Sequence, residues 1–152
     1  MTEHPALMAV VLDAVDARGL AEFYRQLLGY RYRPGDEPPP GGKPDRQGED
    51  WLVLADREGR PRLAVQPVAE LTPADWPAGP TPQQLHLDLA VPDVESLTHW
   101  RDAAVGLGAT VLDDRTTDPI ESLIVFADPA GHPFCILVSP MVRWTPEGDY
   151  QE

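Results

Sequence analysis

The same hairpin signature occurs twice in this chain of 152 residues. Ala-Asp-x-x-Gly-x-Pro is found at 55–61, within LADREGRPRLAV, and again at 127–133, within FADPAGHPFCIL. Aspartate can accept hydrogen bonds within its own turn and glycine tolerates positive φ, so each copy predicts a tight turn between two apolar strands. The two glycines are 131 − 59 = 72 residues apart. Two such hairpins predict a chain built twice from one unit.

The residues before each hairpin repeat as well. In the first half, an apolar strand over 7–15 is followed by Asp16, a predicted helix N-cap, and by apolar residues at helical spacing up to Gly29. The second half repeats this order with a strand over 84–91 and a cap at Asp93. Short apolar strands complete each half, so both halves predict the order β-α-β-β-β and an α+β fold.

Two segments interrupt this pattern. Residues 34–50 are rich in Pro and Gly and lack apolar periodicity, which predicts a mobile surface loop that cannot pack. Such a loop is either a peripheral insertion without a function (decoration) or a lid over a site. A second proline-rich segment predicts a linker, which Trp76 could pin to the body. We therefore expect a single domain with a first unit at 7–68, a linker at 69–83, a second unit at 84–138 and a tail at 139–152.

Composition narrows the partners of the protein. The 25 acidic residues outnumber the 12 basic ones, the formal net charge is −13, and Lys43 is the only lysine. Such a surface repels phosphate backbones, so nucleic-acid binding is not expected. A single cysteine, Cys135, excludes an internal disulfide and fits a reducing compartment. No charged-then-apolar leader or run of 18 apolar residues is present, so we expect no membrane partner and a cytoplasmic location.

Four stretches carry a family resemblance: LDAVDARGLAEFYRQLLGY at 12–30, HLDLAVPD at 86–93, LGA at 107–109 and FADPAGHPFCIL at 126–137. With the duplicated unit, they make the chain similar to the vicinal oxygen chelate superfamily of glyoxalase I, bleomycin-resistance proteins and extradiol dioxygenases, and most closely to bacterial glyoxalase-like domain proteins. The resemblance implies two tandem βαβββ units whose curved mixed sheets surround a cup-shaped pocket. It also implies a homodimer.

The resemblance further implies four metal-ligand positions, on the first and last strand of each half. In this chain they are occupied by Ala9, Leu63, His86 and Cys135. Two aliphatic side chains cannot bind a metal, so we expect no metal and no cofactor. Gln66 is the nearest alternative ligand, but strand alternation puts it on the opposite face from Leu63 unless a bulge intervenes.

Alternation along the strands then predicts the lining of the cup. Beside His86 and Cys135, the predicted ligand-binding residues are Val11, Asp13, Val65, Asp88, Leu137 and Trp51, with Gln84 flanking them. Trp51 could stack on a ligand or simply pack. His86 and Asp88 share a face and could share a hydrogen bond, or His86 could be a satisfied interior residue. For Cys135 we expect a buried inert thiol rather than a nucleophile.

Three functions follow as hypotheses. The first is a metal-free protein that binds a small organic molecule in the cup, in a resistance, sequestration or accessory role. The second is a lyase, isomerase or dioxygenase that uses Zn, Ni, Mn or Fe. The third is a metal-independent enzyme with candidate catalytic residues His86, Asp88 and Asp13 as acid–base groups.

Overall fold

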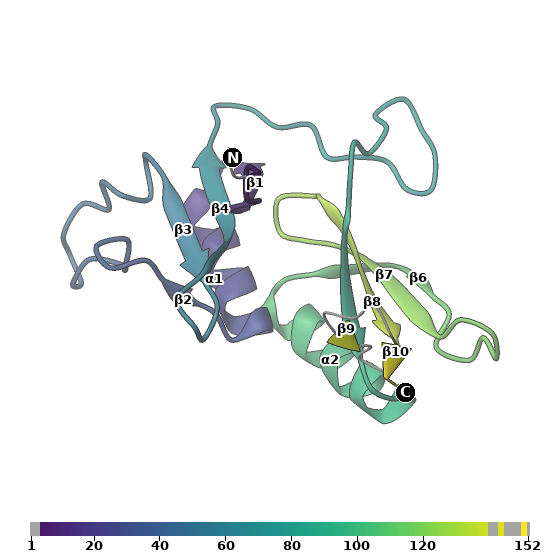
Figure 1. Ribbon diagram of the computed structural model, residues 1–152. Coiled ribbons are helices and arrows are strands. Elements are labelled where there is room, and N and C mark those ends of the chain that lie inside the picture. Colours follow the sequence, from purple (N-terminus) through teal and green to yellow (C-terminus); the bar gives the residue numbers. More distant parts are fainter. Residues whose placement is uncertain (1–3, 140–142, 145–149, 152) are drawn as a thin grey trace. The chain divides into compact units, whose positions relative to one another are not determined.

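The computed structural model describes residues 4–139, 143–144 and 150–151. The chain divides into two compact units, Met1–Leu71 and Thr72–Glu152 (Figure 1). The boundary between them falls inside the segment 69–83 that the sequence marks as a linker. Within the described ranges, no helix is long and apolar enough to cross a membrane.

The first unit is a four-stranded mixed sheet with one helix. Its elements are β1 (Val10–Ala14), α1 (Ala17–Leu28), β2 (Arg31–Tyr32), β3 (Leu52–Ala55) and β4 (Pro61–Pro67). The strand order is β1-β4-β3-β2, with β1 parallel to β4 and the other neighbours antiparallel.

The second unit repeats this arrangement. Its elements are β5 (Leu87–Val91), α2 (Val94–Leu107), β6 (Thr110–Asp114), β7 (Leu123–Ala127) and β8 (Pro133–Val138). The order β5-β8-β7-β6, with β5 parallel to β8, matches the first sheet. The predicted α+β fold with two βαβββ units is therefore confirmed. In the predicted tail, β9 (Arg143–Trp144) pairs with β10 (Tyr150–Gln151), and the other residues from 140 onward lie outside the described ones.

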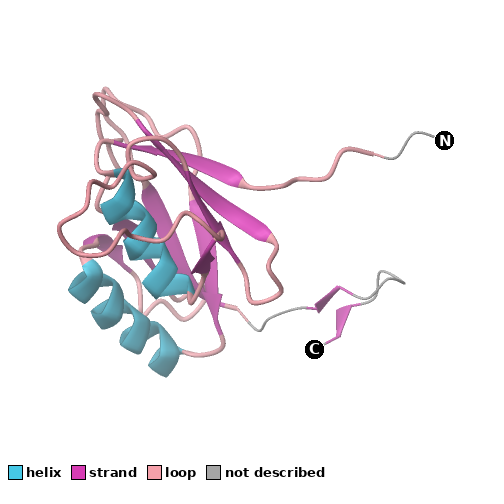
Figure 2. Cartoon of the chain, turned by 90° about the vertical axis from the view of Figure 1, so that its left-hand side faces the viewer, coloured by secondary structure: helices cyan, strands magenta, loops and turns pink. Residues whose placement is uncertain are grey.

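Both helices, drawn in cyan in Figure 2, begin directly after the predicted caps Asp16 and Asp93. The Asp16 side chain accepts a hydrogen bond from the Gly19 amide at 2.9 Å, and the Asp93 side chain accepts one from the Ser96 amide at 2.7 Å. Each helix ends at a glycine in the left-handed conformation, which satisfies carbonyls of the last turn. The local sequence therefore fixes where each helix starts and stops.

Each helix covers one face of its own sheet. Helix α1 packs on β3 and β4, and α2 packs on β5, β7 and β8. The residues that share the buried face of the first sheet are Leu12, Leu52, Leu54, Leu63 and Val65. In the second sheet, the rings of Phe126 and Phe134 stack with centroids 5.0 Å apart. We call the opposite face of each sheet its open face.

One irregularity separates the two hairpins. Leu54 pairs with Leu63 but Ala55 pairs with Pro61, so Arg62 is an extra residue in β4. The corresponding strands β7 and β8 pair without interruption. Because side chains alternate along a strand, this bulge shifts every later residue of β4 by one position relative to the motif.

The segment 34–50 is tied to the body, contrary to the expectation that it cannot pack. Arg18 donates to both carboxylate oxygens of Asp45, at 2.6 and 2.8 Å, and to the Asp36 carbonyl at 2.7 Å. Asp36 itself is buried, and its carboxylate accepts from the Val53 amide at 2.9 Å. Charged and backbone hydrogen bonds replace the apolar packing that the sequence lacks.

Residues 72–83 of the predicted linker belong to the second unit and contact its second hairpin. A Cβ atom placed on Gly131 would lie 2.5 Å from Pro73 Cβ, so the linker contacts the turn of the second hairpin directly. Further along, the Asp75 amide donates to the Thr81 carbonyl at 2.7 Å, and the Asp75 carboxylate accepts from the Thr81 amide at 2.9 Å. These contacts hold the intervening residues in a compact turn.

Candidate functional site

Three ionisable side chains meet on the open face of the second sheet. Asp88 in β5 pairs in register with Cys135 in β8, so both side chains point to the same face. His86 lies one residue before β5, and its Nε2 is 3.4 Å from Asp88 Oδ1. One ligand-type atom from each of the three residues lies within 4.8 Å of the other two.

Burial, and after it Asp88, disfavours ionisation of the Cys135 thiol in this cluster. Burial raises the pKa of the Cys135 thiol to about 11, and the charge of Asp88 and a hydrogen bond to it add to the rise. The thiol is therefore neutral near pH 7. The side chains of His86 and Asp88 are 39% and 60% exposed, and no Arg or Lys pairs with Asp88 in the described part of the chain.

An aromatic side chain from the linker flanks the cluster. The ring of Trp76 approaches the ring of His86 edge-on, with centroids 6.5 Å apart and planes at 75°. The sequence analysis treats Trp76 only as an anchor for the linker and misses its place beside His86. No periodicity within the proline-rich segment signals it, because the position depends on how the linker folds back onto the second unit.

The corresponding positions in the first sheet carry no metal ligand. Val11 pairs with Ala64 as Asp88 pairs with Cys135. The predicted correspondence between Leu63 and Cys135 is therefore wrong by one residue, because the bulge in β4 displaces it. Ala64 takes that position, and its side chain has no donor atom for a metal.

The bulge also changes the predicted lining. Val65 shares the buried face with Leu12 and has no exposed surface, so its predicted place beside Val11 in the lining is wrong. Gln66 pairs with Asp13 and lies on the opposite face from Leu63, as strand alternation predicts. Because the bulge puts Leu63 on the buried face, the face of Gln66 is the open one. Asp13 and Val11 are both exposed.

The remaining predicted residues occupy varied positions. Leu137 alternates with Cys135 along β8 and so shares its face. Gln84 precedes β5, whose ladder begins at Leu87 rather than at the predicted residue 84. Trp51 is half-buried just before β3 and donates its backbone N–H to the Gln47 carbonyl at 3.1 Å. Ligand contact by these three side chains stays a prediction.

The donor set of the cluster decides which metal it could hold. One imidazole, one carboxylate and one thiol fit zinc, which takes three protein ligands and a water in open sites. The thiol must then lose its proton, which the neighbouring carboxylate opposes. Mn and Fe prefer harder donor sets, so the cluster suits them less. At the equivalent positions of the first sheet, the side chains of Ala9, Val11 and Ala64 have no atom that can bind a metal.

The chain thus has a duplicated α+β scaffold of two tandem βαβββ units. The cluster of His86, Asp88 and Cys135 lies on the open face of the second unit alone among the described residues. The model of the glyoxalase-like domain family matches residues 9–137. The chain therefore belongs to the glyoxalase-like domain family, and the predicted membership of the vicinal oxygen chelate superfamily is confirmed.

Solved structures show the same fold at low sequence identity. The chain is similar to a glyoxalase/dioxygenase from Nostoc punctiforme, at 18% identity and a TM-score of 0.61, over 91% of this chain and 99% of that one. It is similar to a glyoxalase/bleomycin resistance protein/dioxygenase family enzyme from Burkholderia phytofirmans PsJN, at 16% identity and 0.59, over 86% and 96%. A lactoylglutathione lyase from Agrobacterium tumefaciens matches at 18% identity and 0.54, over 92% and 98%. No curated protein matches the chain significantly.

Proposed function

We propose that this protein binds a small organic molecule, without a metal ion, on the open face of the second sheet around His86 and Asp88. One observation carries the metal-free part of the proposal: the register that pairs Val11 with Ala64. Val11 and Ala64 stand where the second sheet carries Asp88 and Cys135, and neither aliphatic side chain can bind a metal. A resistance, sequestration or accessory role is compatible with such a site.

The chemistry of the cluster favours a particular kind of ligand. Asp88 is an exposed carboxylate without an Arg or Lys partner among the described residues, and Cys135 beside it is neutral. A ligand that brings a hydrogen-bond donor or a positive charge to Asp88 would satisfy that carboxylate. Trp76 beside His86 offers an aromatic surface for an apolar part of the same molecule.

A ligand screen with calorimetric confirmation tests this proposal. Binding to the purified chain should survive a chelator and fall at least about tenfold in both His86→Ala and Asp88→Asn, since each removes a polar contact. His99→Ala changes an exposed histidine on α2 and should leave binding unchanged. The proposal fails if every hit needs added metal, or if the two variants bind as tightly as the control.

The cluster itself supports a second candidate, a zinc-dependent lyase, isomerase or dioxygenase. His86, Asp88 and Cys135 would hold the ion, which would polarise an oxygen of the substrate. Cobalt substitution tests this without an activity assay, because a thiolate ligand gives an intense charge-transfer band. Such a band, present in the wild type and lost in Cys135→Ser, would support this candidate and contradict the metal-free proposal.

The short distance between His86 and Asp88 supports a third candidate, a metal-independent acid–base enzyme. The carboxylate 3.4 Å from Nε2 can orient the imidazole ring for proton transfer. An activity that persists in chelator and disappears in His86→Ala would establish it. Asp13→Asn would show whether the first-half carboxylate takes part.

We also propose, from the family resemblance, that the protein forms a homodimer. Sedimentation of the intact chain tests this directly. A single monomeric species over the accessible concentration range would contradict it.

A further inference from the structure

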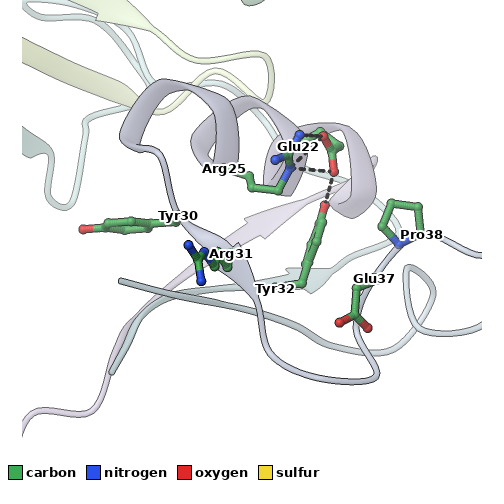
Figure 3. A pocket seen from close by; sticks show the side chains of 7 residues that line it. All are labelled: Glu22, Arg25, Tyr30, Arg31, Tyr32, Glu37 and Pro38. Carbon is green, nitrogen blue, oxygen red and sulfur yellow. Dashed lines mark hydrogen bonds and ion pairs between the residues drawn. The ribbon is translucent and has the colours of Figure 1, made fainter. Parts of the chain in front are cut away.

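The first unit contains a shallow cavity, widely open to solvent, with a volume of about 550 Å³ (Figure 3). It lies between α1, β2 and the beginning of the segment 34–50. Its lining residues are Glu22, Arg25, Tyr30, Arg31, Tyr32, Glu37 and Pro38. None of these belongs to the His86 cluster, which lies in the second unit, so this inference does not rest on the proposed function.

The carboxylates that line the cavity already have partners. Both oxygens of Glu22 accept from Arg25 Nε at 3.1 Å, and Oε1 also accepts from the Tyr32 hydroxyl at 2.8 Å. Burial pushes the pKa of Glu22 up, but these hydrogen bonds hold it below the usual range, so the group stays ionised. Glu37 accepts from the Gly35 amide at 2.7 Å, and Figure 3 shows Tyr32 between it and Arg31.

Two hydrogen-bond donors at the cavity have no protein partner among the described residues. In the described chain, neither the Arg31 guanidinium nor the Tyr30 hydroxyl has a hydrogen-bond or ion-pair partner, and both residues line the cavity. The Arg31 guanidinium is planar and presents two parallel N–H groups, which match the two oxygens of a carboxylate. Arg31 is exposed, so water solvates its guanidinium, and an acceptor on a ligand would take the place of that water.

The walls of the cavity suit a flat apolar group. The ring of Tyr32 is held at its hydroxyl by Glu22, and the guanidinium carbon of Arg18 lies 4.9 Å from the ring centroid. Arg18 also donates two hydrogen bonds to the Asp45 carboxylate, which holds the segment 34–50 that includes Pro38. A fixed aromatic ring provides a stacking surface at low entropic cost.

We propose that this cavity is a binding site for a small aromatic carboxylate. The carboxylate pairs with Arg31 and receives a hydrogen bond from Tyr30, and the ring of the ligand packs against Tyr32, on the side where Figure 3 shows Arg31. The net charge of −13 repels anions at long range, so binding should tighten when moderate salt screens that repulsion. A neutral amide of the same shape lacks the charge that Arg31 recognises.

Titration of the full-length chain with sodium benzoate, followed by NMR or calorimetry, tests this proposal, with benzamide as the neutral comparison. Benzoate should bind saturably and more tightly than benzamide. Arg31→Gln should weaken benzoate binding about tenfold, as expected for loss of a charge-assisted contact. Arg57→Gln removes another exposed arginine without a described partner, in the first hairpin, and should have no effect.

Arg31→Lys keeps the positive charge but loses the planar fork, so its affinity should fall between those of the wild type and Arg31→Gln. If Arg31→Gln does not fold, the lysine variant and the benzamide comparison still decide the question. The proposal is overturned if benzoate does not saturate or binds no better than benzamide. It is equally overturned if the Arg31 variants bind benzoate like the Arg57 variant.

Discussion

Replacement of Gly131 by alanine tests how the linker is held on the second unit. Gly131 has φ +94°, and a Cβ atom there would lie 2.5 Å from Pro73 Cβ and 3.1 Å from its Cα. The left-handed conformation alone costs alanine about 1–2 kcal/mol. Forcing the proline backbone away adds about 1–3 kcal/mol, as overpacking does elsewhere. We therefore expect Gly131→Ala to lower the free energy of unfolding by about 2–5 kcal/mol.

Gly59 provides the matched control, because it occupies the same place in the first hairpin. Its φ is +80°, and a Cβ there would meet nothing within 4 Å. Gly59→Ala should therefore cost only the conformational part, about 1–2 kcal/mol. The difference between the two variants isolates the contact with Pro73.

Urea unfolding of both variants at fixed pH measures this difference. Adding Pro73→Gly should bring the cost of Gly131→Ala most of the way down to that of Gly59→Ala, because the Cβ and Cγ atoms nearest the new methyl group are removed and only the Cα at 3.1 Å remains. Equal destabilisation by the two single variants, or no relief in the double variant, would refute the reasoning.

Three further predictions concern single side chains. Asp36→Ala should destabilise the chain by about 2–4 kcal/mol in urea melts, because the buried carboxylate serves several donors, and Asp36→Asn should cost less. Arg18→Gln should speed limited proteolysis within 34–50, since the hydrogen bonds from Arg18 to Asp45 and Asp36 are lost. An unchanged rate would contradict a role of Arg18 in holding this segment. Alkylation of Cys135 should stay slow until the pH nears 11, and Asp88→Asn should move the profile to lower pH. The raised thiol pKa also contributes to the free energy of unfolding, and this contribution is lost as the pH rises from about 9 to 11. An alkylation profile of Asp88→Asn identical to that of the wild type would argue against the contact between Asp88 and Cys135.

Local signals in the sequence predict most of the scaffold. Asp16 and Asp93 cap their helices because a short acidic side chain reaches the free amides of the first turn. The repeated hairpin motif identifies both turns and, in the second half, the face of the strand. There β7 and β8 pair without a shift, so counting from Gly131 places Cys135 beside Asp88.

The same counting fails in the first half because one residue, Arg62, bulges out of β4. Nothing in its local sequence separates that hairpin from its regular counterpart, and the register is set by the packing of the sheet. The position of Trp76 and the anchoring of the segment 34–50 by Arg18 also depend on contacts between residues far apart in the chain. The spacing of apolar residues predicts which face of a single helix or strand is buried, but it does not predict such contacts between distant segments.

The metal content of the protein as isolated tests the account most directly. After expression in medium supplied with zinc, nickel, manganese and iron, elemental analysis should find far less than one equivalent of any metal per chain. Zinc titrated into the chelator-treated chain should show no saturable site that depends on Asp88 and Cys135. One equivalent of tightly held metal, lost in Asp88→Asn and in Cys135→Ser, would contradict the metal-free site.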